Sequence, residues 1–236
     1  MTKLLRAGAI SGAAGGVALA AVLLLFAEGP IGTAVGLEGG DPRDERFSRG
    51  TQEAGGALGA VLFGIAVGLV FAVVFASVRH RLKLGSDGLR SLAVAGAGFV
   101  AVTLVPLVLY PPNPPGVEGG GSAGMRTWAY LTAVAWSVFA FVVAVKVARR
   151  LRRRGVGEQP AVLAAIALHL LLVLVAALAL PDRVPASDLP AELVWELRLS
   201  SLLGGAALWG ILGLVFPWAA GPALRATGHE RARADA

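Results

Sequence analysis

The chain has 236 residues, of which 56% are hydrophobic and only 15% are charged. A soluble domain usually carries about 25% charged and about 45–50% apolar residues, so this excess of apolar side chains excludes a single water-soluble core and must face lipid. Cysteine is absent, which excludes disulfides and thiolate metal sites. The net charge is +6, and because the basic residues lie beside apolar spans, a membrane surface is favoured over nucleic acid as their partner.

Six apolar windows are long enough to cross a bilayer, since a spanning helix needs about 20 mostly apolar residues. Lipid cannot hydrogen-bond an open backbone, and the windows do not alternate as barrel strands do. We therefore predict an all-α integral membrane bundle over residues 1–221, followed by a short cytoplasmic tail over 222–236. The first window is too long for a typical signal peptide and is predicted to be retained. The windows are 7–26, 54–77, 91–110, 127–147, 161–180 and 200–220.

Basic residues alternate between the two sides of this predicted bundle. The N-terminus, the second and fourth gaps and the tail carry fifteen of the 21 Lys and Arg residues. The positive-inside rule places these segments, and hence both termini, in the cytoplasm. Most acidic residues fall on the opposite side, where they would concentrate cations, or where they are simply tolerated.

Polar residues gather at the predicted outer ends of several spans. Carboxylate oxygens at these ends could bind a divalent cation weakly as it passes. The alternative is that these residues only cap helices and form salt bridges at the membrane interface. Glu192 and Glu196 share a helical face because they are four residues apart. The residues of this predicted outer mouth are Glu28, Gln52, Glu53, Glu192, Glu196 and Arg198.

Small residues recur at four-residue spacing in three of the spans. Such stripes let helix backbones approach closely, which predicts a tightly packed bundle and says little about substrate. The stripes contain Gly8, Gly12 and Gly16, then Gly55, Gly59, Gly64 and Gly68, then Gly204, Gly205, Gly210 and Gly213.

The third span ends in a proline-rich run, Tyr110-Pro111-Pro112-Asn113-Pro114-Pro115, with Pro106 one turn earlier. Proline lacks an N–H group, so carbonyls near Thr103 to Pro106 are expected to lose their helical partners. Freed carbonyls and the Asn113 amide oxygen could coordinate a cation where they line a cavity. A rigid turn that ends the helix is the simpler interpretation.

His169 is the one ionisable side chain near the middle of a predicted span. Such a group is costly in lipid and is therefore a functional hypothesis, and neutral imidazole binds cobalt, nickel or zinc. Glu28, Asn113 and His169 form the predicted metal path. The alternative is a structural histidine hydrogen-bonded to a neighbouring helix near Thr132 or Ser137.

Sequence motifs for catalysis are missing. The chain has no GxxxxGK[ST], no HExxH and no GxSxG segment, and no acid/base pair lies within a span. We therefore predict that the protein is not an enzyme and carries no permanently bound cofactor.

Three ordered segments resemble the CbtA family of predicted cobalt transporter membrane subunits, over essentially the whole chain. The Tyr-Pro-Pro-Asn-Pro-Pro run is the most specific of them. Related proteins often carry histidines in the first outer loop, and this chain has none there. The matching segments are Ala27-Glu28-Gly29-Pro30 with Arg49-Gly50-Thr51-Gln52, then Tyr110 to Val117 with Arg126-Thr127 and Tyr130, then Leu189-Pro190 through Leu197-Arg198-Leu199-Ser200-Ser201-Leu202 to Phe216.

The resemblance implies a permease-like subunit of a cobalt uptake system, with cobalt(II) as the transported ion. It also implies a small single-span partner, similar to CbtB, whose histidines would supply metal ligands that this chain lacks. An oligomer is possible. The competing hypotheses are a non-transporting membrane scaffold or assembly protein, and a transporter of a different solute.

Overall fold

The computed structural model describes residues 1–37, 48–112, 123–179 and 189–234, and within these ranges it contains helices and turns but no strand. Six helices are long and apolar enough to cross a membrane, which confirms the predicted all-α bundle. They span Thr2–Phe26, Arg49–Arg81, Asp87–Leu109, Thr127–Arg153, Glu158–Ala179 and Ala191–Gly221.

Most of these helices extend beyond the apolar windows. The third begins at Asp87, four residues before its window, and Ser86 caps it by accepting a hydrogen bond from the Leu89 amide at 3.2 Å. The last, α8 (Ala191–Ala234), begins well before residue 200 and continues as a helix through most of the segment after residue 221. A hydropathy window marks only the apolar part of a helix, whereas backbone hydrogen bonding continues into its polar ends. The helices are therefore longer than the windows.

The chain forms two compact units, and we describe each by itself. The first unit comprises Met1–Phe99 and Ala191–Ala236, and the second comprises Val100–Pro190. The long helix Asp87–Leu109 passes from one unit to the other within a π-helical turn, η3 (Phe99–Leu104), which joins α4 (Asp87–Gly98) to α5 (Val105–Leu109).

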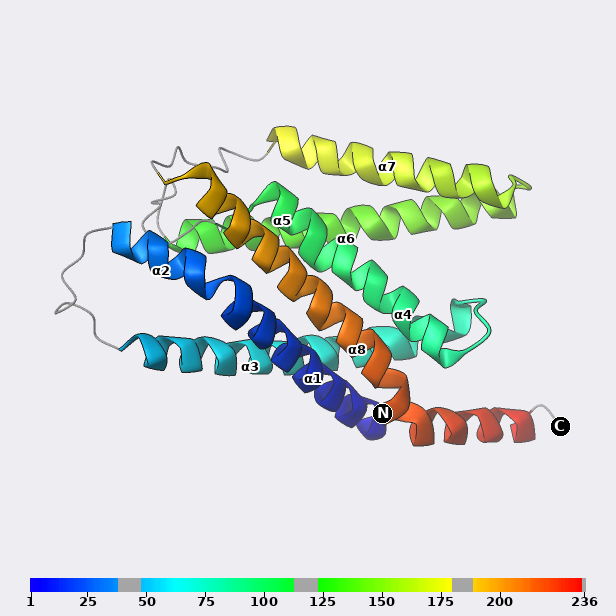
Figure 1. Cartoon of the computed structure of the whole chain (residues 1–236). Coiled ribbons are helices and arrows are strands. Elements are labelled where there is room, and N and C mark those ends of the chain that lie inside the picture. Colours follow the sequence, from blue (N-terminus) through cyan, green and yellow to red (C-terminus); the bar gives the residue numbers. More distant parts are fainter. Residues whose placement is uncertain (38–47, 113–122, 180–188, 235–236) are drawn as a thin grey trace. The chain divides into compact units, whose positions relative to one another are not determined.

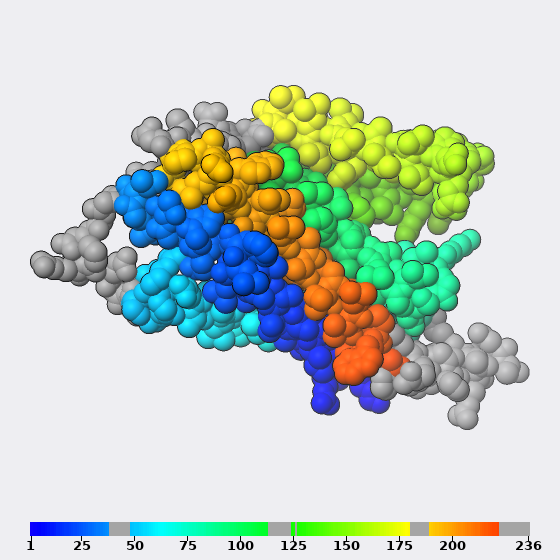
Figure 2. Space-filling model, viewed as in Figure 1, coloured from blue at the N-terminus to red at the C-terminus, as the bar shows by residue number. Residues whose placement is uncertain are grey.

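In the first unit, α1 (Thr2–Phe26) packs along both α3 (Arg49–Val78) and α8 (Figure 1). The side chains of α1 and α8 are in direct contact along the face seen in Figure 2. Phe71 and Phe75 of α3 meet Phe216 of α8 with ring centroids 5.0 Å apart, and all three rings are buried. The remaining elements of the first unit are α2 (Glu28–Leu37) and the short η2 (Arg79–Arg81).

Glycines make the close contact between α1 and α3. A methyl group on Gly12 would lie 2.2 Å from the carbonyl oxygen of Gly64, and one on Gly68 would lie 2.1 Å from that of Gly8. Such contact requires glycine, as the stripes predicted. The prediction was wrong for Gly55 and Gly59, which lie on a different face of α3, and for Gly210 of α8, since all three have open space around them.

The second unit contains α5 and the antiparallel pair α6 (Ala123–Arg153) and α7 (Glu158–Ala179). Gly155 ends α6 with φ +88°, and the amides of Gly155 and Val156 bond to the carbonyls of Arg152 and Leu151, both at 3.1 Å. This Schellman motif turns the chain sharply into α7. The apolar core of the unit consists of Val105, Leu109, Ala133 and Ala176.

Candidate functional site

A break in the first helix positions Glu28. Pro30 has no N–H group, so the Phe26 carbonyl four residues earlier loses its helical donor. Ser200 of α8 lies beside it, with its Oγ 3.0 Å from Phe26 O and 2.7 Å from Glu196 O, so its single proton is shared between two carbonyls. Ser200 is buried. The break is therefore satisfied by a neighbouring helix, and it places Glu28 at the first residue of α2.

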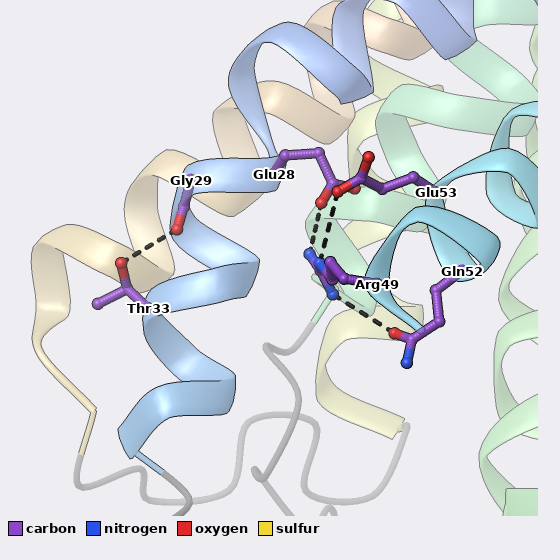
Figure 3. A network of polar contacts seen from close by, with 6 residues as sticks. All are labelled: Glu28, Gly29, Thr33, Arg49, Gln52 and Glu53. Carbon is purple, nitrogen blue, oxygen red and sulfur yellow. Dashed lines mark hydrogen bonds and ion pairs between the residues drawn. The ribbon is translucent and has the colours of Figure 1, made fainter. Parts of the chain in front are cut away.

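Arg49 in the first turn of α3 contacts Glu28 as well as Gln52 and Glu53 of its own helix, and we name Glu28, Arg49, Gln52 and Glu53 the Glu28 cluster (Figure 3). Glu28 forms an ion pair with Arg49. The Arg49 Nε lies 3.7 Å from Glu53 Oε1, and Arg49 Nη1 donates to Gln52 Oε1 at 3.5 Å. Two carboxylates from two helices thus share one guanidinium, which leaves the cluster with one net negative charge.

The structure brings together three predicted outer-mouth residues and adds one that sequence reasoning did not assign. Arg49 lies at the centre of the cluster, in contact with Glu28, Gln52 and Glu53. Its side chain is 37% exposed and that of Glu28 28% exposed, so water screens this ion pair. No signal in the sequence singles out Arg49, since Arg43 and Arg46 lie in the same connecting segment.

Glu192 and Glu196 lie on exposed positions of α8, with the four-residue spacing of one helical face. Their carboxylates make no hydrogen bond or ion pair with any residue in the described ranges. Arg198 is half-buried, and its Nε is buried with no hydrogen-bond partner among those residues. The structure thus shows no polar contact from these three side chains to the Glu28 cluster.

His169 lies in the middle of α7, and both of its ring nitrogens are buried without a hydrogen-bond partner in the part of the chain that the structure describes. Its ring meets that of Phe141 on α6 edge to face, with centroids 6.0 Å apart. The alternative of a hydrogen bond to Thr132 or Ser137 was wrong. Thr132 Oγ1 donates to its own helix at Trp128 O, 2.8 Å away, as threonine hydroxyls within helices commonly do.

Ser137 and Tyr110 share this property with His169. Ser137 is fully buried and its hydroxyl has no partner within the described ranges, and the same holds for the buried Tyr110 hydroxyl. Both residues belong to the second unit, as His169 does. Sequence reasoning did not assign Ser137 a role of its own, since a serine within a span usually bonds to its own helix.

The proline-rich run is only partly described, and Asn113 lies outside the described residues. The expectation of a free Pro106 carbonyl was wrong, because the Tyr110 amide bonds to it at 2.7 Å. The π-helical turn η3 precedes Pro106, and π turns of this kind often accommodate a break in the helical ladder. The local signal predicted a disturbed helix correctly but misplaced the disturbance.

Among the described residues, no group of three or more His, Asp or Glu side chains could enclose a metal ion. The chain therefore offers at most partial ligand sets there: carboxylates with an internal cation in the first unit, and one imidazole in the second. Partial sets suit transient contact with an ion more than tight storage.

A family model described as "Probable cobalt transporter subunit (CbtA)" matches residues 1–221 of the chain. No curated protein and no solved structure matches it.

Proposed function

Because this chain belongs to the CbtA family, we propose that this multi-pass membrane protein is the permease-like subunit of an uptake system for a divalent metal ion, with cobalt(II) as the cargo. The observation that carries the proposal is His169, which lies in a helix long enough to cross a membrane and whose two ring nitrogens are buried without a hydrogen-bond partner in the described chain. An unpaired polar group costs about 1–3 kcal/mol when buried. A cobalt ion that accepts the imidazole lone pair during passage would supply the missing partner and so offset this cost.

The Glu28 cluster would act earlier on the path, as a weak point of contact for the ion. Two carboxylates attract a dication, but Arg49 competes for the same oxygens. Competition by a tethered cation lowers affinity, and a site on a transport path must release what it binds. Glu192 and Glu196 would add to the negative potential at the mouth. Asn113 remains a proposed oxygen ligand on the same path.

We place both termini in the cytoplasm, because the segments on that side carry most of the Lys and Arg residues. We propose that the host membrane is a bacterial inner membrane. A dication moving inward across it would gain about 4.6 kcal/mol per 100 mV of membrane potential. The absence of cysteine from the sequence makes the topology testable. Single cysteines at Ser48 and Ser86 should react with an impermeant maleimide from opposite sides of the membrane, and labelling from one side would refute the topology.

We propose further that a small single-span subunit, similar to CbtB, supplies metal ligands. The described residues hold only partial ligand sets, so capture from dilute solution would need additional nitrogen donors. The partner would be required for uptake at low cobalt and dispensable at high cobalt.

Cobalt accumulation in a bacterium deficient in cobalt uptake tests the function directly. Cells expressing the chain with its genomic neighbour should accumulate cobalt, measured by elemental analysis with nickel and zinc in the same samples. His169→Ala should reduce accumulation about tenfold or more at equal expression, because the ion loses its ligand in the apolar span. His229→Ala is the matched control, since His229 lies beyond the matched residues 1–221, and it should leave accumulation unchanged.

The outcome separates transport from a scaffold role. Equal accumulation with and without the chain, at verified membrane insertion, would favour a scaffold or another solute. A scaffold is a definite alternative because the Glu28 cluster is internally paired and could serve only to join α2 to α3.

A further inference from the structure

One face of α6 changes from apolar to cationic along its length. Phe139 and Val142 are 54% and 42% exposed, and Lys146, Arg149, Arg150 and Arg153 follow, all exposed. The spacing from Phe139 is three, four, three and four residues to Arg153, with Arg150 beside Arg149. Residues with this spacing lie on one side of an α-helix, so the four bases form a single stripe about 10 Å long.

The four bases of this stripe have no counter-charge. None of them makes an ion pair or a side-chain hydrogen bond with any residue that the structure describes. The one nearby acid, Glu158, pairs instead with Arg152 at 3.1 Å, and Arg152 lies off the stripe. The stripe is therefore a cationic surface open to an external anion, directly continuous with exposed apolar surface of the same helix.

We infer that this face binds an anionic phospholipid, with the phosphates against the four bases and an acyl chain along Phe139 and Val142. A phospholipid fits because it has the same two-part character: the charged group sits at the membrane surface and the hydrocarbon lies directly below it. Each base near an anionic membrane surface favours binding. A doubly charged lipid such as cardiolipin matches a stripe of several cations better than a singly charged one.

Two simpler roles for these bases do not explain their common face or its continuation into exposed apolar surface. Cations in the last turn of a helix offset its dipole, but Lys146 lies about two turns before the end of α6 at Arg153. The positive-inside rule needs only basic residues somewhere near the span end. Neither role requires the bases to share a face or to continue an exposed apolar strip. The inference does not depend on which ion the protein carries.

Native mass spectrometry of the detergent-solubilised full chain, titrated with cardiolipin, tests the site. The variant pair Arg149→Gln with Arg153→Gln should weaken cardiolipin binding about tenfold or more. Arg81→Gln with Lys83→Gln removes the same charge from exposed residues outside α6, and should change binding less than twofold. Arg149→Lys with Arg153→Lys keeps the charge and should retain binding, which guards against a variant that merely misfolds.

Three results would overturn the inference. Equal losses in the two Gln pairs would show non-specific attraction by charge. Binding of phosphatidylcholine as tight as that of cardiolipin would show that the bases do not select an anion. Displacement of cardiolipin by equimolar glycerol 3-phosphate would show that the apolar part of the face contributes nothing.

Discussion

Buried polar groups are treated differently in the two units of the chain. In the first unit, the Ser91 hydroxyl donates to the Gly213 carbonyl at 2.8 Å, the Ser200 hydroxyl lies 3.0 Å from the carbonyl freed by Pro30, and the Ser11 hydroxyl donates to the Ala7 carbonyl at 2.8 Å. In the second, the hydroxyls of Tyr110 and Ser137 and both nitrogens of His169 are buried without partners in the described chain.

The buried polar groups with partners stabilise the fold, and those without partners destabilise it. A partnered buried group adds about 1 kcal/mol to stability, while an unpartnered one subtracts about 1–3 kcal/mol. The second unit therefore carries a stability cost at Tyr110, Ser137 and His169, of which His169 is a proposed ion ligand. Arg198, with its unpartnered Nε, is the exception in the first unit, and Trp136, whose part-buried Nε1 donates to Leu172 O at 2.9 Å, is the exception in the second.

The tight glycine contact of the first unit should be the most sensitive feature. Gly12→Val would drive side-chain atoms into the backbone of α3, where even a methyl group would lie 2.2 Å from Gly64 O. We expect a loss of about 3 kcal/mol in the free energy of unfolding, measured by denaturation from mixed micelles. Gly59→Val adds the same side chain to a span where nothing lies within 4 Å, and should cost less than about 1 kcal/mol. Similar losses in both variants would refute the close contact.

His169→Leu should change stability and function in opposite directions. Leucine removes two unpartnered nitrogens from an apolar site, so we expect the free energy of unfolding to rise by about 1–2 kcal/mol. Cobalt accumulation should fall at least tenfold in the same variant. A clear loss of stability would mean that the imidazole has a partner in the membrane, and the contrast between the units would then fail at its central residue.

Two serines of equal burial allow a matched comparison, since Ser91 and Ser137 are each 0% exposed. Ser91→Ala removes the bond to Gly213 O and should cost about 1 kcal/mol, whereas Ser137→Ala removes a hydroxyl that has no partner in the described chain and should be neutral or stabilising. Unfolding in mixed micelles measures both. Equal destabilisation by the two variants would show that Ser137 is hydrogen-bonded in the membrane.

The sequence predicted the six helices because lipid imposes one solution on any long apolar segment. Glu28, Gln52 and Glu53 were predicted at the same end of the bundle because they flank one connecting loop. Their arrangement around Arg49 could not be predicted, since the sequence does not indicate which basic residue forms an ion pair with a given acid. The partner of His169 was mispredicted for a related reason: a small rotation of α7 decides whether an imidazole meets a hydroxyl or the ring of Phe141.

The smallest effect on stability is expected from the Glu28–Arg49 ion pair. Both side chains are partly exposed, so a double-mutant cycle of Glu28→Gln and Arg49→Gln should give a coupling free energy of about 0.5–1 kcal/mol. A coupling of about 3 kcal/mol or more would instead indicate a desolvated pair with a structural role.

The same variants test whether Arg49 competes with the cargo. Arg49→Gln leaves the Glu28 and Glu53 carboxylates without their shared cation, so added cobalt(II) should stabilise this variant more than the parent chain. An ion present at five times its dissociation constant adds about 1 kcal/mol, which a thermal shift in detergent can detect. The double variant Glu28→Gln with Arg49→Gln should lose this gain, because only one carboxylate remains. Equal shifts in the parent chain and Arg49→Gln would show that Arg49 does not occupy a cation site, and the Glu28 cluster would then be only a link between α2 and α3.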